Sequence, residues 1–471
     1  MRLLFSLGIL LSSFALKAQV HFNNAYDING GSGFTATVLE YDSGYYFVSR
    51  SVLDTTPSIN ITKLDYSGNV IFTSRYYFSN FIFNVGAPHS LAVMADNNIV
   101  FCGLINDTNN NNDCFLMKFN ILGDTIWTKK IGGSGFDVGD AVFALADNSF
   151  ILICNTNSFG SGGTDFWRLH IGSTGNIINS NFYGTSGNES AYNGDLTIDG
   201  GTIISGMQNA HPLLVKTDIS GNQQWSQPYL YGDDYCFVSQ LPNGGFIIAT
   251  RKITSTDGSQ ACLIKTDSAG NVLWQKLYGT ADDEYVFCKP IILSDGSIII
   301  GGGVDPLDGS AGPSYVLKTD SAGNEKWFRK YYFTLIHDNY LYDIKSTSDG
   351  GFIFAGSTFV NTQDSWIVKL DSLGCEVAFC DGVGFQESTK EKTTLTVFPN
   401  PSQNAEVTVS WPLQINAELI SVYDATGKLI FTYQPADQQT YFLLHEKFVS
   451  GIYLIQLKYE GGILVEKLIV Q

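Results

Sequence analysis

The chain has 471 residues, enough for more than one domain, and its 45 acidic and 27 basic side chains give a net charge of −18. Nucleic acids and anionic membranes bind through basic patches, so neither is an expected partner. Only 15% of the residues are charged and 48 are glycine, which favours an extracellular β-protein with many tight turns.

Residues 1–18 have the pattern of a secretory signal peptide. Arg2 supplies the positive start, Leu3–Leu16 is apolar, and cleavage is expected after Ala18. No later stretch approaches the roughly 20 apolar residues of a membrane-spanning helix. The sequence therefore predicts a secreted or outer-surface protein with no transmembrane segment after the signal peptide is removed.

The next part of the chain is a repeat with two markers. KTDSAGN occurs at Lys265–Asn271 and again at Lys318–Asn324, and looser copies place a glycine at a mean spacing of 51 residues. These glycines are Gly68, Gly123, Gly175, Gly221, Gly270, Gly323 and Gly374. The second marker is an acidic or Asn residue before a small residue and an apolar run, at Asp42, Asp96, Asp147, Asp199, Asn243, Asp295 and Asp349. Two markers with seven copies each indicate seven structural units.

Each unit is predicted to hold four short strands. Asp-Gly and Asn-Gly between apolar runs predict hairpins, with a type I′ turn at the second marker. An aromatic residue four positions after the repeat glycine, Phe72 or Trp127, Trp225, Trp274 and Trp327, suits packing between neighbouring units. Four strands per period predict an all-β fold, a seven-bladed β-propeller over residues 19–385, with Val20–Tyr26 completing the last blade. A β-solenoid is the alternative architecture.

Eight cysteines in an exported chain permit disulfides. Cys375 and Cys380 are the preferred pair, because they lie where the repeat pattern ends. Cys102 and Cys114 flank an Asn-rich loop and form the second candidate pair. The remaining cysteines lie inside apolar runs and are expected to be buried thiols.

Acidic residues recur where the first strand of five units should begin, at Asp137, Glu189, Asp234, Glu284 and Asp338. Facing one end of a central channel, they could bind a cation such as Ca²⁺ or act as acid and base. The preferred interpretation is structural, with each carboxylate capping turn amides. No other cofactor is expected, and no HExxH, GxSxG or GxxxxGK motif identifies a catalytic residue.

Tyrosines recur after the Trp-bearing strand, at Tyr183, Tyr231, Tyr278, Tyr331 and Tyr332. They could stack on sugars, but packing between blades is the preferred interpretation.

The pattern changes after a predicted linker at 386–394. Residues 395–471 read as a small Ig-like β-sandwich with the segments Pro399–Pro401, Asp424–Lys428, Ser450–Tyr453 and Lys467–Val470. This tail resembles the C-terminal sorting domain (type A) of proteins exported by the type IX secretion system of Bacteroidota. The resemblance implies the type IX machinery as a partner, passage across the outer membrane, and release or surface attachment.

These observations favour a non-enzymatic binding protein that engages a protein or glycan through loops on one face of the propeller. A propeller hydrolase or lyase acting on polysaccharide is the alternative. The two longest departures from the repeat, Asn106–Asp113 and Asp305–Pro313, read as plain polar turns, which favours binding.

Overall fold

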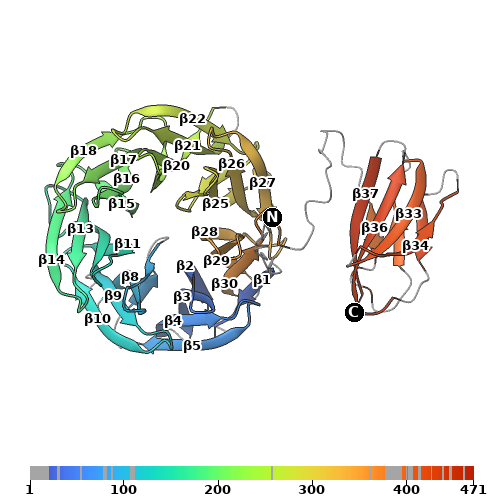
Figure 1. The fold of residues 1–471 in the computed structure, drawn as a ribbon, viewed down its shortest axis with the longest axis horizontal. Coiled ribbons are helices and arrows are strands. Elements are labelled where there is room, and N and C mark those ends of the chain that lie inside the picture. The colour runs from blue at the N-terminus through green and yellow to red at the C-terminus, as the bar shows by residue number, and fades with distance from the viewer. Residues whose placement is uncertain are drawn as a thin grey trace, which may run out of the picture. The chain divides into compact units, whose positions relative to one another are not determined.

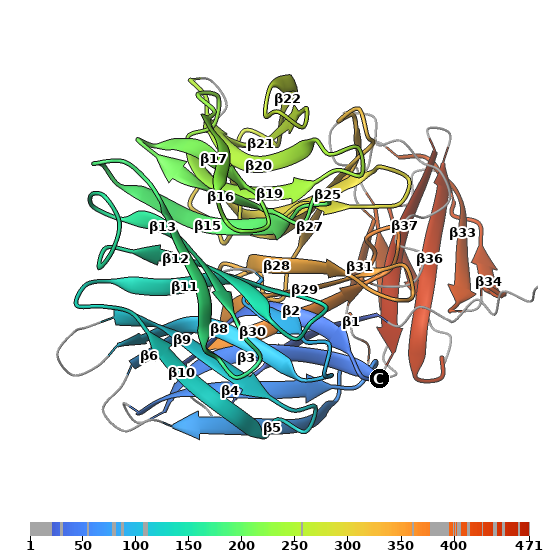
Figure 2. The same ribbon diagram turned by 60° about the vertical axis from the view of Figure 1, so that its left-hand side comes forward.

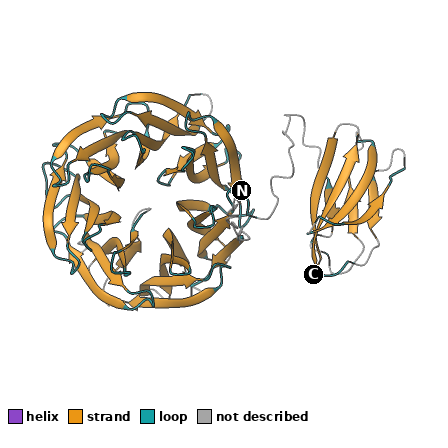
Figure 3. Cartoon of the chain, in the orientation of Figure 1, coloured by secondary structure: helices purple, strands orange, loops and turns teal. Residues whose placement is uncertain are grey.

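The computed structural model describes two compact units, Met1–Gly382 and Val383–Gln471. The described residues are 21–28, 32–53, 56–77, 82–85, 89–106, 112–255, 258–359 and 362–376, then 395–398, 400, 402, 407–411, 415–425, 427–436, 440–444, 448–459 and 462–470. The predicted signal peptide and the linker lie outside them. Every regular element in the described part of the chain is a β-strand (Figure 3).

The described residues of the N-terminal unit form seven antiparallel sheets, numbered 1 to 7 in chain order. Sheet 1 contains β2 (Ser32–Tyr41), β3 (Gly44–Leu53), β4 (Thr56–Leu64) and β5 (Val70–Tyr77). Sheet 2 contains β6 (Ile82–Val85), β7 (Leu91–Val93), β8 (Ile99–Asn106), β9 (Asn112–Phe119) and β10 (Thr125–Ile131). Sheet 3 contains β11 (Asp137–Ala144), β12 (Phe150–Thr156), β13 (Asp165–Ile171) and β14 (Ile177–Tyr183).

Sheets 4 to 7 continue the same order. Sheet 4 contains β15 (Glu189–Leu196), β16 (Thr202–Gln208), β17 (His211–Thr217) and β18 (Gln223–Pro228), and sheet 5 contains β19 (Asp234–Gln240), β20 (Phe246–Ile253), β21 (Ser259–Thr266) and β22 (Val272–Tyr278). Sheet 6 contains β23 (Asp283–Val286), β24 (Ile291–Ile292), β25 (Ile298–Asp305), β26 (Ser314–Thr319) and β27 (Glu325–Tyr331). Sheet 7 contains β28 (Tyr340–Ser346), β29 (Phe352–Phe359), β30 (Gln363–Leu370) and β1 (Phe22–Tyr26).

The sheets stand in a ring, with the first strand of each nearest the centre and the last at the outer edge (Figure 1). Successive strands of one sheet lie side by side, as β11, β12 and β13 do in Figure 2. A separate buried apolar cluster fills each of the seven junctions between neighbouring sheets. The β-branched and aromatic runs of the second marker therefore pack on both faces of their sheets.

The start of the chain completes sheet 7, as the sequence predicted. β1 pairs antiparallel with β30, from Phe22 opposite Lys369 to Tyr26 opposite Ser365. Phe22 also joins the apolar cluster between sheets 7 and 1. The first and last parts of the unit are thus held in one sheet, and the ring closes without an unpaired edge at β30.

The two repeat markers meet within one sheet. The buried or partly buried lysine of the first marker pairs with the acidic residue of the second, at distances of 2.6 to 2.9 Å between Nζ and Oδ. The pairs are Lys63–Asp42, Lys118–Asp96, Lys216–Asp199 and Lys369–Asp349. In sheet 3, His170 takes the lysine position, and its Nε2 lies 2.8 Å from the Ser149 hydroxyl.

The repeat tyrosine and the repeat glycine join neighbouring sheets. At six junctions a tyrosine in the outermost strand, or directly after it at Tyr229, donates its hydroxyl to the carbonyl of the repeat glycine in the next sheet. The pairs are Tyr26–Gly68, Tyr76–Gly123, Tyr183–Gly221, Tyr229–Gly270, Tyr278–Gly323 and Tyr331–Gly374. The packing role predicted for Tyr183, Tyr278 and Tyr331 is confirmed. In that series Tyr229 takes the place predicted for Tyr231.

The aromatic residue of the first marker packs on the same glycine of the next sheet. A Cβ at Gly374 would lie 2.6 Å from the ring of Trp327, and one at Gly323 would lie 2.8 Å from Trp274. The backbone at Gly374 also has a φ of 79°, which side chains rarely adopt. The glycine is therefore required by both the turn and the neighbouring ring.

The type I′ turn predicted at the second marker is wrong at six of its seven copies. Among the seven copies, only the one at Asp42 and Ser43 has positive φ at two successive positions. The other six copies have one such residue, at Asn97, Asn148, Gly200, Gly244, Gly296 and Gly350. A type I turn followed by one left-handed residue gives a longer hairpin loop that needs a single positive φ.

The C-terminal unit holds two sheets around one core. One sheet contains β31 (Thr396–Phe398), β32 (Val407–Ser410) and β35 (Tyr441–Leu444). The other contains β33 (Ala417–Asp424), β34 (Leu429–Tyr433), β36 (Gly451–Tyr459) and β37 (Gly462–Val470). Val409 and Leu444 from the first sheet and Ile420 and Ile455 from the second belong to the same buried cluster.

The motif residues of this unit fix its turns. The side chain of Asn400 bonds the β37 backbone, accepting from Ile469 N at 2.8 Å and donating to the Lys467 carbonyl. The Asp424 carboxylate accepts from Lys428 N at 3.0 Å, and Gly427 has a φ of 81°. The Tyr453 hydroxyl donates to the Val449 carbonyl at 2.9 Å.

The cysteine predictions have different outcomes. Cys102 and Cys114 are free and buried, so the disulfide expected between them is wrong. In the hairpin, Cys102 lies opposite Leu116 and Cys114 opposite Leu104, so the two are not cross-strand partners. Cys375 is disulfide-bonded, but Cys380 lies outside the described residues and the pairing stays a prediction. None of the described residues belongs to a helix that could cross a membrane.

Candidate functional site

The innermost strands share an irregularity near the axis of the ring. Five of them shift register at a corresponding point, at Ala36, Asp140, Tyr192, Tyr235–Cys236 and Tyr342. In sheets 2 and 6 the inner strand is instead broken in two, between β6 and β7 and between β23 and β24. A bulge re-aims side chains and is common beside functional sites.

Aromatic rings form a continuous arc over five neighbouring sheets at this level. The ring centroids of Tyr192 and Tyr235 lie 5.0 Å apart, those of Tyr235 and Phe287 5.8 Å, and those of Phe287 and Tyr342 5.7 Å. Phe34 continues the arc, 4.9 Å from Tyr342. All five side chains are only partly buried. We call Tyr192, Tyr235, Phe287, Tyr342 and Phe34 the aromatic arc.

A rim of polar and aromatic side chains lies beside the arc, toward the beginning of the inner strands. The Arg251 guanidinium lies 4.5 Å from the ring centroid of Tyr285 and 2.6 Å from the Asp234 carboxylate. The Tyr340 hydroxyl donates to Asp305 Oδ1 at 3.2 Å. Burial and the nearby Asp338 charge raise the pKa of Asp305, so its carboxyl holds a proton more readily than an ordinary aspartate.

Polar contacts between non-adjacent sheets lie deeper along the same strands. Lys289 of sheet 6 pairs with Asp195 of sheet 4 at 2.8 Å, and its Nζ lies 5.3 Å from the ring of Phe143 in sheet 3. Lys345 of sheet 7 contacts His89 of sheet 2 and lies 2.5 Å from Asp343. These contacts bridge the axis, so they form a floor beneath the aromatic arc.

The floor holds unusual charge states. Burial, Lys345 and Lys289 lower the pKa of His89 to about 4, so this imidazole is neutral at pH 7. The Asp343 side chain is fully buried, yet Lys345 and His89 outweigh that burial and hold its pKa at about 2. Thr37 and the Val38 amide donate to its other oxygen at 3.1 and 3.3 Å. The floor is therefore a satisfied polar network, in which Asp343 is the fixed negative charge.

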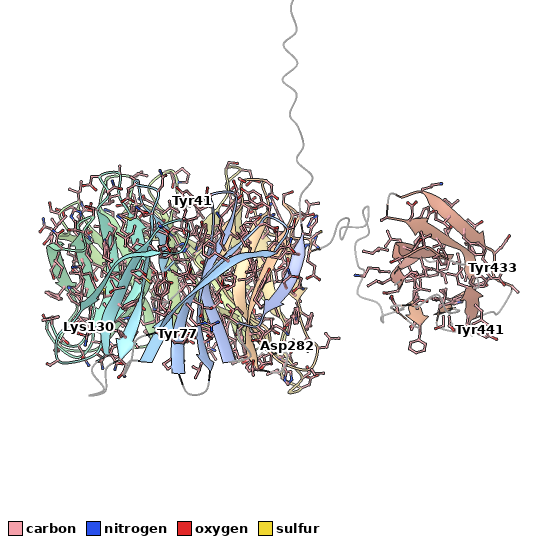
Figure 4. The ribbon with its side chains drawn as sticks, turned by 90° about the horizontal axis from the view of Figure 1, so that it is seen from below. Tyr41, Tyr77, Lys130, Asp282, Tyr433 and Tyr441 are labelled. Atoms are coloured by element: carbon pink, nitrogen blue, oxygen red, sulfur yellow. The ribbon has the colours of Figure 1, made fainter. Side chains whose placement is uncertain are left out.

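The rim and the aromatic arc lie toward one end of the N-terminal unit. Figure 4 places Tyr41, at the end of β2, at one end and Tyr77, Lys130 and Asp282 at the other. The inner strands begin at the end marked by Lys130 and Asp282, because Asp282 directly precedes β23 and Lys130 lies near the end of β10, the strand before β11. The rim and the arc face this end, and the floor separates them from the end marked by Tyr41.

The five predicted acidic residues occupy different environments. Asp137, Glu189 and Glu284 are buried, and each accepts the backbone N–H of the residue four positions earlier, at 2.8 to 2.9 Å. Asp234 accepts Tyr235 N and pairs with Arg251, while Asp338 accepts Gly312 N at 2.8 Å. These hydrogen bonds are the ones that turn capping requires. Of the five, Asp234 is part of the rim through its ion pair with Arg251, and the charge of Asp338 acts on Asp305 of the rim.

The same residues do not form a metal cluster. Across the described residues, no three His, Cys, Asp or Glu side chains are grouped so that they could hold a metal ion. Burial raises the pKa of Glu284, whereas hydrogen bonds from Gln208 and Thr185 outweigh burial and lower that of Glu189. Ca²⁺ binding by the five carboxylates stays a prediction.

The sequence reasoning missed the aromatic arc. Tyr192, Tyr235 and Tyr342 stand at corresponding bulges, but the equivalent bulges hold Ala36 and Asp140 in other sheets, so no repeated residue marks the position. One signal was available, because aromatic residues interrupt the otherwise small and polar inner strands at Tyr192, Tyr235, Tyr285 and Tyr342.

Comparison with known families identifies the C-terminal unit. Residues 396–471 match the family described as the secretion system C-terminal sorting domain. This unit is a type IX sorting domain. The protein is therefore secreted or carried on the outer cell surface, as the sequence predicted.

Comparison of the fold gives distant likenesses only. A protein of unknown function from Dyadobacter fermentans is 12% identical, with a TM-score of 0.41 over 62% of this chain and 100% of its own. A puromycin hydrolase is 10% identical, with a TM-score of 0.48 over 81% of this chain and 59% of its own. The polysaccharide lyase Uly1 is 10% identical, with a TM-score of 0.44 over 77% and 94%. No curated protein matches the sequence significantly.

Proposed function

We propose that residues 19–385 form a seven-bladed β-propeller that acts outside the cell as a binding protein. The seven sheets of the described residues, with one apolar cluster at each junction, support the blade count. The tail at 395–471 is a type A, Ig-like sorting domain of the Bacteroidota kind, which delivers the propeller through the type IX machinery.

The aromatic arc above the floor carries the proposal of binding. Tyr192, Tyr235 and Phe34 pack at the edges of junction clusters, but Phe287 and Tyr342 belong to none of these clusters, so packing at the junctions does not account for the whole arc. Aromatic surface beside a few fixed polar groups is the usual composition of a ligand site. The ligand enters from the end where the inner strands begin, because the Lys289–Asp195 ion pair and the Lys345–His89 contact bridge the axis at the other end.

Polysaccharide hydrolysis or elimination is the alternative function. Asp305 favours it, because a carboxyl group with a raised pKa next to a tyrosine hydroxyl is suited to general acid catalysis. Release of new chain ends from a polysaccharide by the wild-type protein, and its loss in Asp305→Asn, would establish this alternative.

The experiment for binding is an array of glycans and proteins probed with the secreted full-length chain. We expect at least one ligand whose binding is lost in Tyr342→Ala, because Tyr342 contacts both Phe287 and Phe34 within the arc. Tyr77→Ala is the matched control, because Tyr77 is 52% exposed on the outermost strand of sheet 1. Ligands that bind both variants as they bind the wild type would contradict a binding site at the axis.

A further inference from the structure

We propose that the axial site binds a neutral carbohydrate chain, with Tyr285 and Tyr340 as its stacking surfaces and Arg251 and Asp305 as its hydroxyl-binding groups. This inference rests on the proposed binding function and names the ligand class for the same site.

The first support is the near-parallel orientation of two pairs of aromatic rings. The rings of Tyr285 and Phe287 are nearly parallel, at 13° with centroids 5.8 Å apart. The two residues are two positions apart in β23 and directly after it, and side chains at this spacing point to the same side of an extended segment. Tyr340 and Tyr342 on the next sheet have the same arrangement, at 29° and 6.3 Å. A Cβ at Gly303 would lie 2.7 Å from the Tyr340 ring, so glycine at this position makes room for it. Tyr285 and Tyr340 are only partly buried, so the two pairs leave aromatic surface on neighbouring sheets for the C–H faces of sugar rings.

The second support is the set of polar groups at the edges of those rings. Arg251 holds Asp234 through one terminal nitrogen, while its buried Nε–H has no hydrogen-bond partner. Asp305 accepts the Tyr340 hydroxyl at 3.2 Å and also interacts with Tyr285, and a carboxylate with two acceptor oxygens keeps lone pairs for further donors. A donor on one side and an acceptor on the other suit a sugar hydroxyl, which accepts and donates at once.

The third support is the charge balance at the axis. Arg251, Lys289 and Lys345 each lie within 2.8 Å of a carboxylate, so these cations are already neutralised. Asp305 and Asp338 add acidic character to the rim, and the whole chain carries −18. An anionic polymer would be repelled by this field, whereas a neutral chain is indifferent to it.

Peptides fit the same surface less well. A peptide chain brings backbone amides that need regular partners, such as an open strand edge. The innermost strands at the axis pair along one edge only, but they are interrupted by the bulges and breaks at the level of the arc. Rings and side-chain polar groups therefore dominate what the site presents.

The test is isothermal titration of the secreted full-length protein with defined probes. These are neutral oligosaccharides from glucan, xylan and mannan, oligosaccharides of alginate and chondroitin sulfate, and a mixed peptide library. We expect a neutral oligosaccharide to bind, and Tyr285→Ala and Tyr340→Ala each to weaken it about tenfold or more, as for loss of one stacking platform. Tyr285→Phe keeps the ring and should bind within about threefold of the wild type.

Two controls keep the test decisive. Tyr77→Ala should leave binding unchanged, since Tyr77 lies on an outer strand. If Tyr285→Ala lowers the melting temperature, Tyr285→Leu keeps the apolar bulk without a ring and replaces it. Binding that survives in Tyr285→Leu would overturn the stacking role.

The outcomes separate this inference from the proposed function. A peptide or an anionic polysaccharide that binds at the axis and is lost in Tyr342→Ala would overturn the neutral-carbohydrate assignment but leave the binding function intact. If no probe depends on Tyr342, Tyr285 or Tyr340, both are wrong.

Discussion

The outer strands of the N-terminal unit carry nearly the same residues from sheet to sheet, whereas the inner strands differ. At the outer edge of the ring, a tyrosine hydroxyl reaches the next sheet's glycine at six junctions. In four sheets, the repeat lysine holds the acidic residue in the turn that precedes the second strand of the repeat unit. At the axis, corresponding positions hold Ala36, Asp140, Tyr192, Tyr235 and Tyr342.

This difference separates structural residues from candidate functional ones. A residue that recurs in every sheet performs the same packing task at every junction. Residues at the axis have no such task in common, and there the chain places an aromatic arc on one side and charged groups on the other. In a repeat protein, departures from the repeat are therefore the more informative guide to a binding site.

Removing β1 should have the largest effect on stability, because the ring closes through this strand, which joins sheet 7 from the opposite end of the unit's sequence. Deleting residues 19–27 leaves β30 with an unpaired edge and removes Phe22 from the cluster between sheets 7 and 1. We expect loss of cooperative unfolding at 37 °C, measured by circular dichroism and calorimetry. Phe22→Ala, which keeps the strand, should cost only about 3 kcal/mol. A deletion variant with the melting temperature of the wild type would contradict ring closure by β1.

Acidification should test the inner strands selectively. Because the unfolded chain protonates His89 near pH 6.5 and the native state resists protonation down to about pH 4, stability should fall as pH drops through this window. The loss should reach at most about 3 kcal/mol. Urea unfolding at pH 7, 5.5 and 4 measures it. His89→Asn, which tolerates the local φ of 75°, should remove this part of the pH dependence. Equal slopes for both proteins would show that His89 is not the group responsible.

Two glycines with the same backbone conformation can distinguish the cost of turn strain from the cost of disturbed packing at the outer edge of the ring. Gly374 and Gly350 have φ values of 79° and 84°, but only Gly374 lies against a ring, that of Trp327. We expect Gly350→Ala to cost about 1 kcal/mol from φ strain alone. Gly374→Ala should cost roughly 1 to 3 kcal/mol more, because Trp327 must move. Chemical unfolding gives both values, and equal costs would mean that the aromatic packing contributes nothing.

The tyrosine lock should make a smaller contribution at each junction. Tyr278→Phe removes the hydroxyl that donates to the Gly323 carbonyl at 2.7 Å, in a buried position. We expect a loss of about 1 kcal/mol of unfolding free energy. Tyr77→Phe, at a 52% exposed site, should change it by less than about 0.5 kcal/mol. A loss at Tyr77 as large as that at Tyr278 would rule out a special role for the buried hydroxyl.

Calcium should have the smallest effect on stability. Backbone amides, hydroxyls and Arg251 already bind the carboxylates of Asp137, Glu189, Asp234, Glu284 and Asp338. We therefore expect millimolar Ca²⁺ to leave the melting temperature unchanged. A rise that disappears in the Asp234→Asn, Glu284→Gln double variant would establish a cation site instead.

The sequence by itself determined the repeat, the strand content, the closing role of Phe22–Tyr26 and the export tail. These features depend on local chemistry repeated at fixed spacing, such as turns that need glycine and apolar runs that need burial. Even there, the turn type at Asn97 or Gly244 was beyond it, because a type I′ turn and a three-residue loop share the same residues.

Only the tertiary structure decided what stands at the axis. Tyr192, Tyr235, Phe287, Tyr342 and Phe34 are separated by up to about 300 residues in the chain, and no periodic signal links them. The pairing of Lys289 with Asp195 and of Lys345 with His89 skips a sheet each time, so it depends on the curvature of the ring. Bulges and ring closure, which are properties of assembled sheets, bring these side chains together, and a one-dimensional pattern holds no record of them.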